Sequence, residues 1–238
     1  MRKRIALIMV AFIFALTGCA NVEPDQEKAS VPTDMTISVE NPQMTVTDQS
    51  EILKDVLLGD SPFFYCSDGN TETMLITDVP ALFDENDPLM KVWEFSVVDM
   101  NGDGENEVIL FVVGVAGDMG GKVILHQIDN KVYAYTTDNR TLMDLKMDGS
   151  YGYSDPTGVN EVGIVAVVDF SEAEYTVDKI TYATGTYKGW DTFVADQQPV
   201  TEEEYLDAVS VQDQKQNAEW YEFTDENINT LSCSDYGK

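Results

Sequence analysis

Residues 91–113 read KVWEFSVVDMNGDGENEVILFVV, and most of the fold prediction rests on them. Two runs rich in β-branched and aromatic residues, 91–98 and 107–113, flank a polar segment that contains two glycines. Such runs favour strands, and a Gly/Asn/Asp segment between them favours a turn. The stretch therefore predicts two antiparallel strands joined by an acidic loop. Together with a following hairpin it has about the size of one propeller blade.

Similar runs continue along the chain and predict further strands. They are MLIT (74–77), KVILHQI (122–128), KVYAYTT (131–137), EVGIVAVVDF (161–170) and YTVDKITYATG (175–185). Asp129-Asn130 fits a two-residue hairpin turn, because both residue types tolerate positive φ, and SEAE (171–174) forms another short connection. The predicted fold is mainly β: an antiparallel β meander of propeller-blade-like hairpins.

Short helices are predicted on both sides of the meander. The segment 48–51 resembles a capping box and precedes apolar residues at helical spacing, with Gly59 as a stop. The segment 201–204, TEEE, is a second capping box. The residues that indicate a helix laid against the sheet after it are Tyr205, Leu206, Val209 and later Trp220.

The N-terminus has the composition of an export signal. MRKR is basic, and the apolar run IALIMVAFIFA is shorter than the roughly 20 residues that a membrane span takes. The motif LTGC (16–19) ends this segment and resembles the lipobox of bacterial lipoproteins. The resemblance implies that residues 1–18 are removed. It also implies that lipidated Cys19 anchors the chain in the outer leaflet of the cytoplasmic membrane, facing outside a cell of Gram-positive type. An ordinary signal peptide with an incidental cysteine is the alternative.

The rest of the chain divides by composition. Residues 19–48 are polar, contain three prolines and have no sustained apolar period, which is typical of a flexible tether. Residues 49–230 are predicted to form a single β-rich domain, and residues 231–238 a C-terminal tail.

The loop between the first two strands has the composition of a calcium site. Calcium takes six to eight oxygen atoms from carboxylates, amides, backbone carbonyls and water. An EF-hand does not fit, because the flanking runs are strands and the twelfth position is not a carboxylate. The predicted ligands are Asp99, Asn101, Asp103 and Glu107 through their side chains and Glu105 through its carbonyl. An acidic turn held by its own Asx hydrogen bonds is the alternative.

The loop resembles the calcium loop of FG-GAP repeats, which are known from integrin α propellers and bacterial surface proteins. The family pattern Asp-x-Asp-x-Asp-Gly-x-x-Asp matches Asp99, Asn101, Asp103, Gly104 and Glu107, with Asn and Glu in place of two aspartates. The Phe-Gly and Gly-Ala-Pro signatures are missing, and the likeness covers only residues 93–113, so it does not imply a complete propeller. The lipobox, tether, single loop and late TEEEY helix together resemble surface lipoproteins of Firmicutes.

Composition narrows the classes of function. Acidic residues outnumber basic ones 43 to 14, for a net charge of -29. Such a surface repels nucleic acid and attracts cations or basic partners. The single histidine, His126, rules out a multi-histidine metal site and is expected to hold an ordinary sheet position. Cys66 and Cys233 are expected to be unpaired thiols, with a disulfide as the alternative.

Aromatic spacing gives the remaining candidate site. Tyr133 and Tyr135 share one face of a predicted strand, as do Tyr151 and Tyr153 if that segment is extended. Exposed rings can stack on sugars, although core packing explains the same spacing. No carboxylate pair stands out as a catalytic set among 43 acids. We therefore expect a non-enzymatic, calcium-binding surface lipoprotein that binds a protein or glycan. An accessory hydrolase acting on cell-wall or dietary polysaccharide is the alternative.

Overall fold

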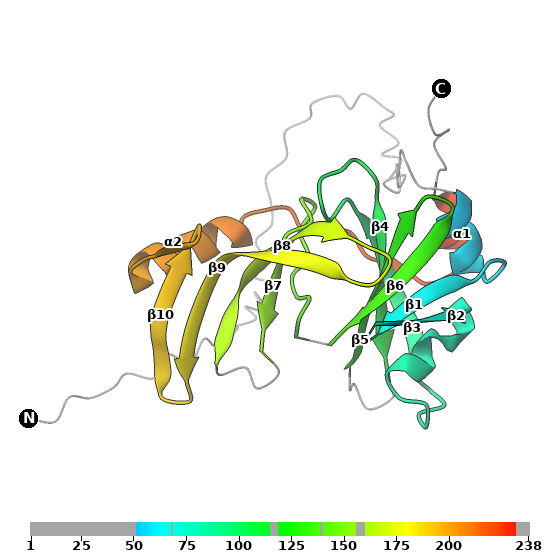
Figure 1. Cartoon of the computed structure of the whole chain (residues 1–238), viewed down its shortest axis with the longest axis horizontal. Coiled ribbons are helices and arrows are strands. Elements are labelled where there is room, and N and C mark those ends of the chain that lie inside the picture. Colours follow the sequence, from blue (N-terminus) through cyan, green and yellow to red (C-terminus); the bar gives the residue numbers. More distant parts are fainter. Residues whose placement is uncertain (1–50, 68, 115–118, 139, 156–159, 232–238) are drawn as a thin grey trace, which may run out of the picture. The chain divides into compact units, whose positions relative to one another are not determined.

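The computed structural model describes residues 51–67, 69–114, 119–138, 140–155 and 160–231. The predicted signal peptide, Cys19, the tether and Cys233 lie outside these residues. The described part is mainly β, as predicted, with a seven-stranded sheet and a five-stranded sheet in the same compact unit (Figure 1). The helices are α1 (Glu51–Leu58), the 3-10 helix η1 (Ile76–Leu82), α2 (Glu202–Asp213) and α3 (Asp225–Thr230).

The first sheet is built on the predicted meander. Its central strands are β3 (Lys91–Val98), β4 (Glu107–Val113), β5 (Met119–Ile128) and β6 (Lys131–Thr137), each antiparallel to the next. Asp129 and Asn130 form the two-residue turn between β5 and β6, and Asp129 has a φ of 55°. The tolerance of Asp for positive φ therefore serves the turn as the sequence predicts.

The edges of this sheet depart from a simple meander. β1 (Phe63–Ser67), β2 (Asn70–Met74) and β12 (Tyr221–Glu222) complete the order β12-β3-β4-β5-β6-β1-β2. β1 runs parallel to β6, so the sheet is not wholly antiparallel.

The predicted strand at 74–77 is wrong, because η1 begins at Ile76. Asp78 accepts a hydrogen bond from the Leu75 N–H at the start of η1, and Pro80 inside it lacks the N–H that a strand ladder needs.

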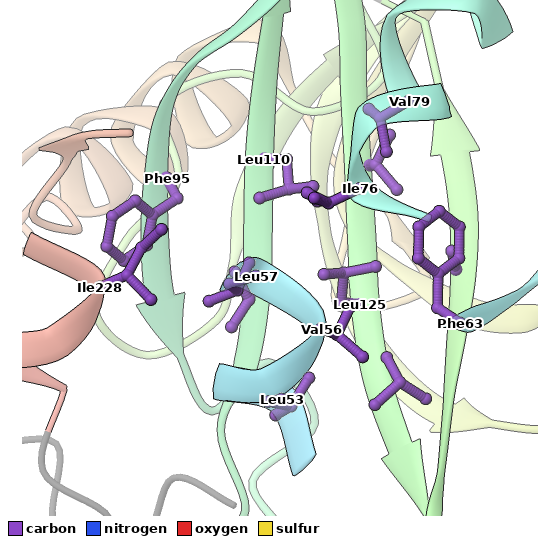
Figure 2. Close-up of a cluster of buried hydrophobic side chains, with 14 of the residues drawn as sticks. Leu53, Val56, Leu57, Phe63, Ile76, Val79, Phe95, Leu110, Leu125 and Ile228 are labelled. Carbon is purple, nitrogen blue, oxygen red and sulfur yellow. The ribbon is translucent and has the colours of Figure 1, made fainter. Parts of the chain in front are cut away.

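One face of the first sheet is covered by α1, η1 and α3. α1 is followed directly by Gly59, whose φ is 82°, and it buries Leu53, Val56 and Leu57. Figure 2 shows these three side chains beside Leu110 of β4 and Leu125 of β5. Each buried leucine or valine contributes about 1.5–3 kcal/mol relative to exposure. This cluster therefore holds the N-terminal helix on the sheet.

The second sheet is an antiparallel meander in itself. Its strands are β7 (Tyr151–Ser154), β8 (Glu161–Phe170), β9 (Tyr175–Thr186), β10 (Gly189–Ala195) and β11 (Gln198–Pro199), and they neighbour one another in chain order. Ser171 and Glu174 close the predicted short connection between β8 and β9 through a hydrogen bond from Ser171 N–H to the Glu174 carbonyl.

α2 begins at the predicted capping box and packs on β9 and β10. Thr201 Oγ1 accepts the Glu204 N–H, and Glu204 Oε2 accepts the Thr201 N–H. Tyr205 is buried and its ring contacts Phe193 of β10. Leu206, by contrast, is exposed, and Trp220 lies beyond the end of the helix.

A second core cluster joins the two sheets. It includes Ile109, Ile124, Tyr133 and Tyr135 from the first sheet and Tyr151, Val165, Val167 and Phe170 from the second. Alternate residues of a strand face opposite sides, so β6 directs Val132 and Ala134 to the helix-covered face and its tyrosines to the second sheet. Over the described residues the strands close neither a propeller nor a barrel. The described strands therefore do not confirm the predicted propeller-blade-like arrangement.

Candidate functional site

The acidic loop connects β3 to β4, and the Asp99 carboxylate organises it. Its Oδ1 accepts the Gly102 N–H at 2.7 Å, and its Oδ2 accepts the Gly104 N–H at 3.0 Å. The two glycines have φ values of 76° and 92°, in the region that disfavours residues with a side chain. The backbone therefore wraps around this carboxylate because glycine occupies both positions.

Asn101 and Asp103 are bonded within the loop. Asn101 Nδ2 donates to Asp103 Oδ2 at 2.8 Å, and Asp103 Oδ1 accepts the Glu105 N–H at 2.7 Å. The Glu105 N–H bond, and that from the Asp103 N–H to Asn101 Oδ1, are of the Asx type predicted as the alternative to calcium. Where the structure describes the chain, no group of three or more His, Cys, Asp or Glu side chains is arranged to hold a metal ion.

The exposed part of the loop still fits a calcium ion chemically. Asp99 and Asp103 offer carboxylate oxygens, and an oxygen that accepts one N–H keeps a second lone pair. Hard oxygen donors on an exposed loop are the ligands that calcium prefers. The fit therefore holds for three of the predicted side chains, Asp99, Asn101 and Asp103.

Glu107 lies beneath the loop and is fully buried, with 0% of its surface exposed. Its Oε2 accepts the Met100 N–H at 2.7 Å, and its Oε1 lies 2.8 Å from His126 Nδ1. Burial raises the pKa of the Glu107 carboxyl, while the hydrogen bonds from His126 and Met100 oppose that rise. The predicted ligand set is therefore divided between the exposed loop and a buried carboxyl at its base.

The contact of His126 with the base of the acidic loop was not predicted from the sequence. His126 occupies the expected position in β5, next to Glu107 of β4 because Val108 pairs with Leu125. Its ring stacks on Phe170 of the second sheet, with centroids 4.2 Å apart and planes at 12°. A signal was present in the sequence: Glu107 is the one polar residue of the run 107–113, and His126 directly follows three apolar residues, 123–125. The antiparallel register needed to bring them together is not visible in either run.

Gly149 supports the loop from a second segment. Its φ is 77°, and a Cβ at this position would lie 2.5 Å from the Met100 carbonyl oxygen and 2.8 Å from that of Asp99. The Gly149 N–H donates to the Lys146 carbonyl, which closes a tight turn against the loop. The start of the acidic loop is therefore held by Glu107 and by this turn.

The tyrosines predicted to contact a glycan do not form an exposed row. Tyr133, Tyr135 and Tyr151 are buried in the cluster between the sheets, and Tyr153 is half-buried. Core packing, which explains the same spacing, therefore accounts for three of the four. The shared strand face was predicted correctly, but the second sheet covers that face. Tyr153 donates its hydroxyl hydrogen bond to Glu161 at 2.8 Å.

Cys66 is buried, and among the described residues its thiol is free. Its Sγ donates to the Glu172 carbonyl, and burial raises the pKa of the thiol. Its predicted alternative partner, Cys233, is outside the described residues.

Of the helices that the structure describes, none has the length and apolar character needed to cross a membrane.

The chain was compared with protein families, with curated proteins and with solved structures. No protein-family model, no curated protein and no solved structure matches this chain.

Proposed function

We propose that this protein is a lipoprotein anchored through Cys19 in the outer leaflet of the bacterial cytoplasmic membrane. Exposed outside the cell, it binds a protein or a glycan and catalyses no reaction. The LTGC motif and the polar segment 19–48 support the anchor and the tether. The state of the single histidine supports a non-enzymatic role. His126 contacts Glu107 and lies flat against Phe170, so its ring is not presented to a substrate.

The acidic loop is proposed to bind one calcium ion that stabilises the β3–β4 connection. The observation that carries this proposal is the inward-held Asp99 carboxylate, around which Gly102 and Gly104 donate their N–H groups. Asp99, Asn101 and Asp103 are proposed to supply side-chain oxygens, and Glu105 its carbonyl. Glu107, predicted as a further ligand, is buried with both oxygens bonded to Met100 and His126, so it is proposed to support the loop from its base. Because Asn101 brings no charge, we expect weak binding, at about 0.1–1 mM as in other extracellular modules.

Calcium binding predicts a melting temperature that depends on the ion. At ten times the dissociation constant, linkage gives about 1.4 kcal/mol of added stability. For a chain of this size that raises the melting temperature by about 3–6 °C. The measurement compares thermal unfolding of the full chain in EDTA and in about 5 mM calcium.

Two variants with the same change of charge separate the site from general electrostatics. Asp103→Asn is expected to abolish the calcium-dependent rise. Asp129→Asn removes a carboxylate from the β5–β6 turn, where Asn also tolerates the φ of 55°, and is expected to keep the rise. Equal melting curves in EDTA and in calcium would overturn the calcium proposal.

The anchor is tested separately in cells supplied with a labelled fatty acid. The full chain is expected to incorporate the label and to fractionate with membranes. Cys19→Ala is expected to carry no label and to remain unprocessed or be released. A labelled, membrane-bound Cys19→Ala chain would show that the lipobox interpretation is wrong.

A further inference from the structure

A pocket of about 370 Å³ opens on the first sheet beside β4 and β5. Glu94, Phe111 and Lys122 line it from three adjacent strands, because Glu94 pairs with Phe111 and Phe111 pairs with Lys122. Asp144, Asn217 and Trp220 line it from segments outside the strands. Its volume lies at the lower end of the range of small-molecule sites, roughly 300–1,000 Å³. The pocket therefore suits a single small molecule.

Lys122 is the unusual group in this pocket. Only 9% of its surface is exposed, and among the described residues no carboxylate forms an ion pair with its ammonium group. Lys146, Lys179 and Lys215 each place their ammonium on a side-chain oxygen. Burial lowers the pKa of Lys122, while the charge of Asp138 opposes this shift. A buried ammonium that no described carboxylate pairs with is unfavourable, and an incoming anion would relieve it.

The other side chains that line the pocket restrict the kind of anion that fits. The Lys122 ammonium lies 5.2 Å from the centroid of Phe111, and the Phe111 ring meets Trp220 edge-on at 6.2 Å. These two rings offer an apolar surface next to the cation. Glu94 is half-buried and Asp144 is exposed, and both carboxylates line the same pocket. They repel a multiply charged anion but accept hydrogen bonds from ammonium or hydroxyl groups.

We propose that this pocket binds a small organic carboxylate that carries hydrogen-bond donors at its other end. The carboxylate meets the Lys122 ammonium, the body of the molecule lies against Phe111 and Trp220, and its donors face Glu94 and Asp144. This proposal rests on the binding role proposed above and names a class of ligand for it, but it needs neither the lipid anchor nor the calcium ion. Two sources share this chemistry: a uronic acid from a glycan, and a free amino acid.

The test is a titration of the full chain with Trp93→Phe and Trp190→Phe, which leaves Trp220 as the single tryptophan of the three. The probes are glucuronate, galacturonate, phenylalanine and leucine, each added up to about 10 mM. The controls without a carboxylate are glucose for glucuronate, galactose for galacturonate, phenylalaninamide for phenylalanine and leucinamide for leucine. At least one carboxylate is expected to change Trp220 fluorescence saturably. Its analogue without the carboxylate is expected to bind at least about tenfold more weakly.

Two lysine variants locate the contact. Lys122→Met keeps the length of the side chain without its charge and is expected to weaken binding by about tenfold or more. Lys131→Met is the matched control, because Lys131 also lies over a phenylalanine ring of this sheet, at 5.5 Å from Phe64, but is exposed. It is expected to leave binding unchanged.

The outcomes are distinct. Binding of uronates alone assigns the ligand to glycans, and binding of amino acids alone assigns it to free amino acids or peptides. The proposal is overturned if no carboxylate binds, or if Lys122→Met binds as tightly as the parent. The analogues without a carboxylate decide the case if Lys122→Met does not fold. The calcium-dependent rise in melting temperature is measured on the same samples. If no carboxylate binds but this rise remains, the pocket proposal fails and the calcium proposal stands.

Discussion

A carboxyl group that water cannot reach needs hydrogen-bond donors inside the protein, and Glu107 has two neighbours that serve. The Met100 N–H donates to one oxygen, and His126 Nδ1 lies within hydrogen-bond distance of the other. Met100 is itself buried and follows directly after the residue that organises the acidic loop. Glu107, at the start of β4, therefore fixes the start of the acidic loop through a hydrogen bond that is shielded from solvent.

Removal of this carboxyl is expected to destabilise the protein strongly. Glu107→Ala leaves the Met100 N–H and His126 without their partner, at a cost of about 3 kcal/mol. Glu107→Gln keeps the shape and an acceptor oxygen and is expected to lose about half as much. The measurement is urea unfolding at pH 7 in EDTA, so that calcium does not contribute.

The control for this series lies in the same loop. Glu105→Ala removes an exposed side chain but keeps the backbone N–H that donates to Asp103. It is expected to change the free energy of unfolding by less than about 0.5 kcal/mol. If Glu107→Ala were as mild as this control, the buried carboxyl would not hold the loop.

At the scale of elements, local pattern was sufficient for most strands. The run KVWEFSVV and the run EVILFVV became β3 and β4, and the Thr201–Glu204 capping box starts α2. Each of these depends on neighbouring residues in the chain. The segment at 74–77 failed because Asp78 and Pro80, just after it, favour a helical turn over a ladder.

Partnerships between distant elements were not predictable in this way. Nothing local shows that β1 lies beside β6, or that the tyrosine-bearing face of β6 is covered by the second sheet. The same limit applies to the candidate site. The loop residues Asp99, Asn101 and Asp103 were found because they lie close together in the sequence. His126 and Lys122 were missed because their importance depends on neighbours from other strands.

On the scale of the whole molecule, the cluster between the sheets makes the free energy of unfolding depend on pH in the alkaline range. Tyr135 and Tyr151 are buried there, and burial raises the pKa of both hydroxyls above their ordinary value of 10.0. Below about pH 10 both the folded and the unfolded chain keep these protons, so their burial carries no penalty. Above that pH the unfolded chain releases protons that the folded chain retains, so the free energy of unfolding falls as pH rises.

Urea unfolding at pH 8, 10 and 11 is expected to show this loss, at up to about 1.4 kcal/mol per pH unit for each buried tyrosine. Tyr151→Phe keeps the ring and removes one titrating group, so it is expected to flatten the dependence. Tyr187→Phe is the control, because Tyr187 is 83% exposed at the tip of the β9–β10 hairpin. Identical pH dependences for the two variants would contradict the assignment to the buried cluster.

The parallel pairing of β1 with β6 also has a consequence for the order of folding. The Tyr65 hydroxyl bonds to Thr136, 71 positions later, so the ribosome releases β1 long before its partner exists. Closing a loop of that length is slow compared with forming the successive hairpins from β3 to β6. The first strand of the sheet to be synthesised is therefore expected to dock among the last. Until then, β6 remains an open sheet edge to which another chain could add a strand.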